Sequence, residues 1–168
     1  DDNDKYAVGH GLAPRLTYGF SLGAEWNGFD FSCLFQGNAG LQVYWQDKFY
    51  MGYINYGDVI NKEIAEGAWR EGRTNATYPR LLTGLNTINA QPSDFWVQNK
   101  SYLRLKNVQI GYKIPKKFLQ KLDISQLRLY TSLENMLTFT SYKGIDPEIS
   151  GTTYPTMKQI TVGINLVF

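Results

Sequence analysis

The last twelve residues of the chain, 157–168, read Met-Lys-Gln-Ile-Thr-Val-Gly-Ile-Asn-Leu-Val-Phe. Apolar and polar positions alternate here, so one face of an extended strand would carry Ile160, Val162, Ile164, Leu166 and Phe168. The opposite face would carry Thr161, Gly163 and Asn165, with Val167 as its apolar exception. A period of two predicts a β-strand with one apolar face.

This segment has the pattern of the closing strand of a transmembrane β-barrel. Such a strand is apolar outside, small or polar inside, and about 9–11 residues long. The chain stops on the apolar Phe168, whereas the termini of soluble domains usually fray. The edge strand of a soluble β-sandwich is the alternative that this segment alone leaves open.

Composition excludes several other classes of protein. The chain has 168 residues, enough for one domain, and its net charge of +2 without a Lys/Arg stripe argues against a nucleic-acid partner. Cys33 and His10 are the only residues of their types, which excludes a disulfide framework and the usual zinc sites. No apolar run approaches the ~20 residues of a membrane-spanning helix. No cofactor is expected.

A hairpin is predicted near the N-terminus, with strands over residues 15–26 and 28–39. Its turn, Asn27-Gly28, is the strongest short hairpin signal. One face of this hairpin is almost entirely aromatic or aliphatic: Leu16, Tyr18, Phe20, Leu22, Trp26, Phe29, Phe31 and Phe35. A small soluble core would have difficulty burying so many rings, whereas lipid accepts them, and Trp26 suits an interfacial aromatic girdle.

Two further strands are predicted over 101–113 and 125–139. In the first, the apolar positions change phase near Lys106-Asn107, which predicts a β-bulge. Between the two strands, Pro115 is expected to begin about two helical turns over 115–122.

Three connections lack sustained alternation: residues 1–14, 40–100 and 141–156. The longest holds a possible short helix near Val59–Ala65 and many aromatic residues, among which Trp45, Tyr53 and Trp69 are candidates for contacting substrate or a partner. Packing of the loop's own small core is the alternative for these rings. Asp1, Asp2 and Asp4 could belong to a calcium-binding turn, since Ca²⁺ takes clustered carboxylates, but the EF-hand spacing is incomplete and a plain solvated loop is the favoured explanation.

Short turns and long loops therefore alternate between about five long strands. This is the plan of an outer-membrane barrel, with the turns at 27–28 and 114–124 periplasmic and the three loops extracellular. The predicted fold class is all-β, an antiparallel transmembrane β-barrel. Five strands cannot close a bacterial barrel, so the chain is expected to be a C-terminal part of a larger one.

Several strings of sequence resemble one family in this order. They are Leu103-Arg104-Leu105-Lys106-Asn107-Val108, Asn135-Met136-Leu137-Thr138 and Tyr142-Lys143-Gly144-Ile145-Asp146-Pro147-Glu148. Together with Trp26-Asn27-Gly28-Phe29-Asp30 and Thr74-Asn75-Ala76-Thr77-Tyr78-Pro79-Arg80 they resemble the C-terminal end of the SusC/RagA family, the TonB-dependent outer-membrane importers of Bacteroidetes. The family more often has Tyr-Lys-Gly at the hairpin turn, and its plug domain and TonB-contacting segment have no counterpart here.

The resemblance implies a parent barrel of 22 strands with an internal plug. It implies import of oligosaccharides or peptides driven by TonB, a SusD-like lipoprotein as partner, and a location in the outer membrane among its lipids. It implies no catalytic residues.

Two other classes of function remain as alternatives. One is a soluble β-sandwich carbohydrate-binding module with the aromatic loop as its platform. The other is a glycosidase, which needs two carboxylates about 5–10 Å apart. Asp94, Asp146 and Glu148 are available for it, but their spacing is not diagnostic.

Overall fold

The computed structural model describes the chain over residues 5–7, 13–44, 53–54, 60–83, 93–120, 123–149 and 154–168. The chain divides into two compact units, which are taken separately below. The first comprises Asp1–Gly11 and Gln42–Gln98, and the second comprises Leu12–Leu41 and Asn99–Phe168.

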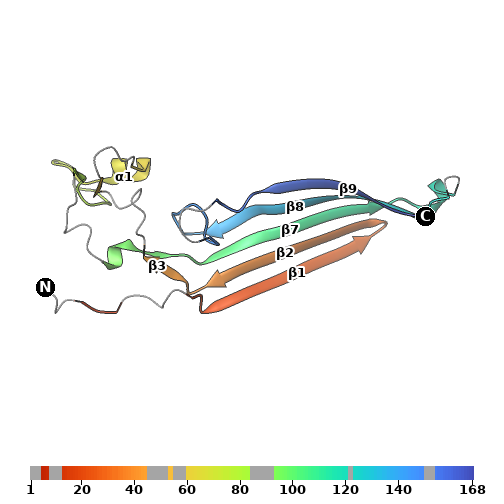
Figure 1. The fold of residues 1–168 in the computed structure, drawn as a ribbon, viewed down its shortest axis with the longest axis horizontal. Helices are drawn as coiled ribbons and strands as arrows, with labels where there is room; N and C mark the ends of the chain where they lie inside the picture. The colour runs from red at the N-terminus through yellow and green to blue at the C-terminus, as the bar shows by residue number, and fades with distance from the viewer. Residues whose placement is uncertain are drawn as a thin grey trace. The chain divides into compact units, whose positions relative to one another are not determined.

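The second unit is a five-stranded antiparallel sheet in the order β1-β2-β7-β8-β9 (Figure 1). Its strands are β1 Leu16–Trp26, β2 Phe29–Ala39, β7 Tyr102–Lys113, β8 Gln126–Thr140 and β9 Gln159–Val167. Every strand begins and ends within two residues of the range expected from alternation. The predicted all-β, antiparallel class is confirmed, and the sheet is not closed into a barrel by these strands.

The hairpin β1–β2 turns at Asn27-Gly28, as the sequence predicts. Both residues have positive φ, 48° and 87°, the geometry of a two-residue type I′ turn that matches the twist of the flanking strands. Trp26 pairs with Phe29 next to the turn, and Leu16 pairs with Ala39 at the far end. The full ladder places every ring of the predicted face on the same side of the hairpin.

The predicted bulge in β7 is confirmed. Leu34 of β2 pairs with Asn107 and the next residue, Phe35, pairs with Leu105, so Lys106 is the extra residue. A second irregularity follows in β8, where Asn135 has φ 55°. The bulge directs both Lys106 and Asn107 to one side of the sheet.

The sheet has an apolar face and a polar face, and the apolar face is exposed. Phe20 is 47% exposed, Leu22 59%, Val162 76% and Ile164 63%. Burying such a side chain is worth about 1.5–3 kcal/mol. A contiguous face of this kind is therefore an interaction surface, because isolated soluble domains do not leave one in water.

The prediction of a helix over 115–122 is wrong for residues 115–120, which the structure describes. A single 3₁₀ turn, Lys116–Phe118, follows Pro115, whose ψ of 137° is extended rather than helical. The preceding residue, Ile114, still donates to Leu127 O in the strand ladder. Phe118 is 64% exposed while Leu119 is 3% exposed, so the two do not share a face.

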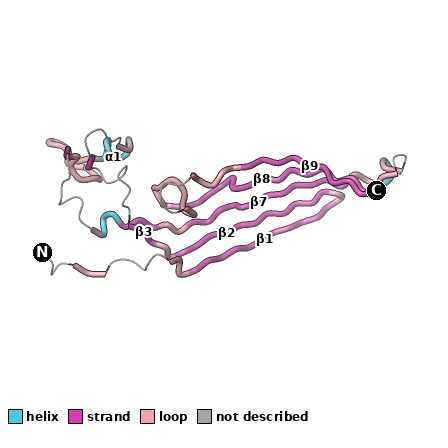
Figure 2. The backbone as a smooth tube through the Cα atoms, in the orientation of Figure 1, coloured by secondary structure: helices cyan, strands magenta, loops and turns pink. Residues whose placement is uncertain are grey.

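The described residues of the first unit form short helices and strands (Figure 2). They are β3 Gln42–Tyr44, paired with β6 Val97–Asn99; β4 Tyr53–Ile54, paired with β5 Leu82–Thr83; the helix α1 Lys62–Gly67; and the 3₁₀ turn Asp94–Trp96. Ile64, Ala68, Tyr78 and Trp96 form a small buried core. The expected short helix is present, and Asn61 is its N-cap residue, whose side chain accepts from Glu63 N–H. No helix in the described part of the chain is long and apolar enough to cross a membrane.

Candidate functional site

The polar face of the sheet carries an ion pair that crosses one strand. Arg128 of β8 donates through Nε to Asp30 Oδ1 of β2 at 2.9 Å, passing over Gly111 of β7. Its Nη2 also donates to Asp30 and, at 3.0 Å, to Gln109 Oε1. A Cβ at Gly111 would lie 2.5–2.6 Å from both charged groups, so glycine is required for the crossing. The polar face is thus cross-linked over three strands.

A second set of charges joins the polar face to the connection between β8 and β9. Arg104 of β7 donates from Nη2 to Asp146 Oδ1 at 2.8 Å and from Nε to Thr138 Oγ1 at 2.8 Å. Asp146 also accepts from the backbone N–H of Glu148 at 2.8 Å and of Thr156 at 3.0 Å. One carboxylate therefore bonds the strand and two positions of the loop at once.

Glu148 completes this group. Its Oε1 accepts from Tyr102 OH at 2.9 Å and lies 2.6 Å from Lys106 Nζ, and its Oε2 accepts from Arg104 Nη1. We call Tyr102, Arg104, Lys106, Asp146 and Glu148 the loop cluster. The bulge at Lys106 matters here because it brings that ammonium to the same face as Arg104.

Burial makes the loop cluster energetically significant. The side chains of Arg104 and Asp146 are only 4% and 5% exposed. Burial raises the pKa of Asp146, but the Arg104 guanidinium and the N–H groups of Glu148 and Thr156 outweigh it, and the pKa lies below its usual range. Burial raises the pKa of Glu148, but the hydrogen bonds from Lys106 and Tyr102 lower it by more, so the pKa of Glu148 lies below its usual value.

A buried lysine extends the contact between strand and loop. Lys100 is 5% exposed, donates from Nζ to Ile149 O, and lies 5.6 Å from the ring centroid of Tyr142. Burial lowers the pKa of Lys100. Residues 142–149 are therefore held against the polar face by several independent contacts, and this part of the predicted outer loop is fixed to the wall.

The three candidate contact residues are only partly described. Trp69 lies in the first unit, 45% exposed, with Arg80 Cζ 5.9 Å from its ring centroid. Trp45 lies outside the described residues, and Tyr53 is described only as backbone of β4. The described residues therefore do not bring the three together.

The acidic residues considered for a calcium site or for glycoside hydrolysis do not form such a site in the described residues. Asp1, Asp2 and Asp4 lie outside the described residues, and the described part of the chain has no cluster of metal-binding side chains. Asp146 and Glu148 both form ion pairs with basic side chains, so they are not available as the acid and base of glycoside hydrolysis.

The loop cluster was not predicted from the sequence. Its signal was present, because Arg104 and Lys106 fall in one recognisable string and Asp146 and Glu148 in another. Opposite charges in two strings that occur together are a reason to expect a contact between them.

Comparisons with known proteins identify relatives of this chain. No family model matches the chain. The chain is 32% identical to TonB-dependent receptor P3 of Formosa agariphila over 92% of its own length and 16% of the relative's. It is 26% identical to TonB-dependent receptor SusC of Bacteroides thetaiotaomicron, over all of this chain and 16% of that protein.

Solved structures give the same result. A structure of the RagAB peptide transporter superposes with a TM-score of 0.75 at 30% identity, covering 96% of this chain and 19% of that one. The RagAB peptide importer in its open-open state superposes with a TM-score of 0.70 at 32% identity, covering 94% of this chain and 17% of that one.

The chain thus spans less than a fifth of the length of these relatives. The TonB-dependent receptors that this chain matches are outer-membrane β-barrels, which removes the soluble-sandwich alternative. The chain belongs to the SusC/RagA family of TonB-dependent receptors and forms part of the wall of an outer-membrane β-barrel.

Proposed function

We propose that the protein to which this wall belongs imports oligosaccharides or peptides across the outer membrane, driven by TonB and working with a SusD-like lipoprotein. The observation that carries the proposal is the two-faced sheet: an exposed apolar face for lipid and a cross-linked polar face for a lumen. The relatives named TonB-dependent receptor and the RagAB peptide importer support the direction of transport. The chain itself contributes wall and outer loops and carries no catalytic step.

The proposed orientation places the turns at 27–28 and 114–124 in the periplasm. The connections 1–14, 40–100 and 141–156 would then be extracellular. Residues 142–149 are held against the polar face, where such a loop would narrow the mouth of a lumen without meeting lipid.

Trp45, Tyr53 and Trp69 are proposed to contact the substrate or the lipoprotein. The exposed ring of Trp69 suits stacking against a sugar ring or an apolar peptide side chain. The neighbouring Arg80 guanidinium adds a donor beside the ring.

The test uses the full-length receptor with its lipoprotein. Alanine at Trp45, Tyr53 and Trp69 together is expected to reduce uptake of a fluorescent oligosaccharide or peptide, or retention of the lipoprotein during purification. Trp26→Ala, at the hairpin turn, is the matched control and should change neither. Unchanged uptake and unchanged lipoprotein retention in the triple variant would exclude these residues as the contact site.

A further inference from the structure

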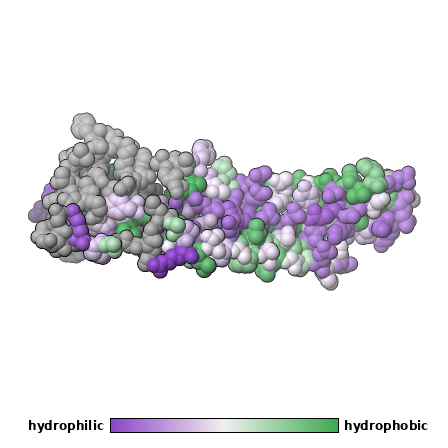
Figure 3. Space-filling model, turned by 60° about the horizontal axis from the view of Figure 1, so that its bottom comes forward, coloured by the Kyte–Doolittle hydropathy of each residue, from purple (hydrophilic) through white to green (hydrophobic). Residues whose placement is uncertain are grey.

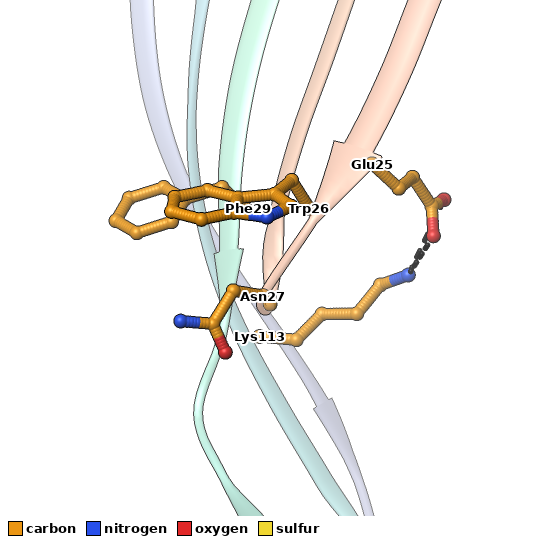
Figure 4. A pocket seen from close by; sticks show the side chains of 6 residues that line it. Glu25, Trp26, Asn27, Phe29 and Lys113 are labelled. Carbon is orange, nitrogen blue, oxygen red and sulfur yellow. Dashed lines mark hydrogen bonds and ion pairs between the residues drawn. The ribbon is translucent and has the colours of Figure 1, made fainter.

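Charged side chains on the polar face of the sheet pair with one another. Glu25 lies 3.4 Å from Lys113 Nζ at the end of the hairpin, on the side opposite Trp26 (Figure 4). Asp30 is paired with Arg128 on the same face. In the space-filling view, hydrophilic and hydrophobic side chains are interspersed over the strands (Figure 3). Paired charges attract a further ligand weakly, because the field of each is offset by that of its neighbour.

Asp94, in the first unit, is an exposed carboxylate without a basic partner in the part of the chain that the structure describes. It begins the 3₁₀ turn Asp94–Trp96. Its side-chain contacts are hydroxyl groups: Tyr6 OH donates to Oδ2 at 3.3 Å, and Ser93 Oγ donates to Oδ1 at 3.3 Å. A carboxylate has about four acceptor sites, so Asp94 keeps both its negative charge and spare acceptor capacity for a ligand.

Exposed aromatic rings lie beside this carboxylate. Tyr6 is 71% exposed, and its hydroxyl contact keeps its ring next to Asp94. Phe95 is 47% exposed and packs edge-to-face on two buried rings, with centroid distances of 4.7 Å to Trp96 and 6.2 Å to Tyr78. Phe95 is therefore anchored on the small core of the first unit while part of its ring faces solvent.

This combination favours a cationic ligand. The face of an aromatic ring carries a negative quadrupole that attracts ammonium and guanidinium groups. A carboxylate adds a charge-assisted hydrogen bond to such a group. A neutral sugar could stack on the rings and donate hydroxyl groups to Asp94, but it would leave the negative charge without a counter-charge.

We propose that Tyr6, Asp94 and Phe95 bind the ammonium group of a peptide, either that of a lysine side chain or that of the N-terminus. The inference rests on the proposed function and narrows its substrates to peptides with an accessible ammonium. Tyr6 and Asp94 belong to the connections 1–14 and 40–100, which the proposed orientation places outside the cell. The site would therefore meet a peptide before it enters the barrel.

The test measures direct binding to the purified full-length receptor by fluorescence polarisation. The first probe is a short peptide of alanine, glycine and serine with one lysine, blocked at both termini and labelled at its C-terminal end. The second carries Nε-acetyl-lysine in its place. The third has no lysine and a free N-terminus. The variants are Asp94→Asn, Tyr6→Leu and Phe95→Leu, and Glu71→Gln is the control because Glu71 is another exposed acid of the first unit.

Asp94→Asn should weaken binding of an ammonium-bearing peptide about fivefold, as expected for loss of an exposed ion pair. The asparagine has the same shape and still accepts from Tyr6 and Ser93, so the fold should be retained. Loss of either ring should weaken binding about two- to fivefold. The acetyl-lysine peptide should bind weakly and equally to the unmodified receptor and Asp94→Asn. Dependence on Asp94 with the first or the third peptide supports the site and identifies which ammonium it takes.

Equal affinity of Asp94→Asn and the unmodified receptor for every peptide would overturn the proposal. An equal loss in Glu71→Gln would do the same, since it would show an effect of net charge alone. Binding of a neutral cello-oligosaccharide that depends on Asp94, without binding of the peptides, would assign the site to sugar instead.

Peptide uptake, measured separately in cells, distinguishes this inference from the transport proposal. Binding that depends on Asp94 in a receptor that takes up no peptide or oligosaccharide would contradict the transport proposal and support the site. Normal peptide uptake together with binding that ignores Asp94→Asn would overturn the site and leave the transport proposal intact.

Discussion

Arg104 and Asp146 are 42 residues apart in the chain, and Arg104 Nη2 donates to Asp146 Oδ1 at 2.8 Å in a buried ion pair. The pair explains why two strings, 103–108 and 142–148, belong to one structural unit. The first supplies the cations on a bulged strand, and the second supplies the carboxylates on the loop. Because Asp146 bonds two loop N–H groups as well, the loop conformation and the contact to the wall depend on each other.

Arg104→Met is expected to release this loop. Removing one partner of a buried pair leaves an uncompensated charge and costs about 3–5 kcal/mol. Hydrogen–deuterium exchange of the full-length receptor should show residues 142–149 exchanging much faster than in the unmodified protein. Arg128→Met is the matched control, since it breaks the pair with Asp30 on the same face without touching the loop. Equal protection of the loop in the two variants would contradict the assignment.

The loop should also be released by acid. The pKa values of Asp146 and Glu148 lie below their ordinary values of 3.8 and 4.5, so folding favours both charged forms. This stabilisation is complete above about pH 5 and is lost as the pH falls through the lowered values, below about pH 4. Exchange of residues 142–149, corrected for the intrinsic rate, should rise over that range. Asp146→Asn should remove the part of the pH dependence that Asp146 contributes and leave that of Glu148. Protection of residues 142–149 that persists unchanged to about pH 2 in the unmodified receptor would contradict this prediction.

Gly111→Ala is expected to destabilise the wall by about 1–3 kcal/mol, as overpacking does. The new methyl group would meet the Arg128 guanidinium and the Asp30 carboxylate at 2.5–2.6 Å and force the pair apart. Gly23→Ala is the control, because its Cβ would meet only Phe31 O at 3.6 Å, an ordinary contact. Unfolding in urea should separate the two variants. A fall in stability at Gly23 equal to that at Gly111 would mean that the Asp30–Arg128 crossing is not the cause.

The five strands could be predicted from sequence because a period of two is a local property of each segment. The bulge was equally visible, since the phase of the apolar residues changes at Lys106. The loop cluster depends on contacts across more than forty residues, so the only sequence signal for it is the joint occurrence of two oppositely charged strings, which does not identify the pairs. The helix after Pro115 failed because proline is compatible with extended backbone as well as with a first helical turn. The paired strands of the first unit are two or three residues long, too short for periodicity to appear.

The most direct test of the account compares two adjacent residues of β9. Val162 is 76% exposed on the apolar face, and Thr161 lies on the polar face opposite Ser132. In the full-length receptor folded into liposomes, Val162→Lys should lower the free energy of unfolding by about 2–4 kcal/mol, because it places a charge in lipid. Thr161→Lys should change it by less than about 1 kcal/mol. Equal tolerance of lysine at both positions, or a greater loss at Thr161, would show that the apolar face of this sheet does not face lipid.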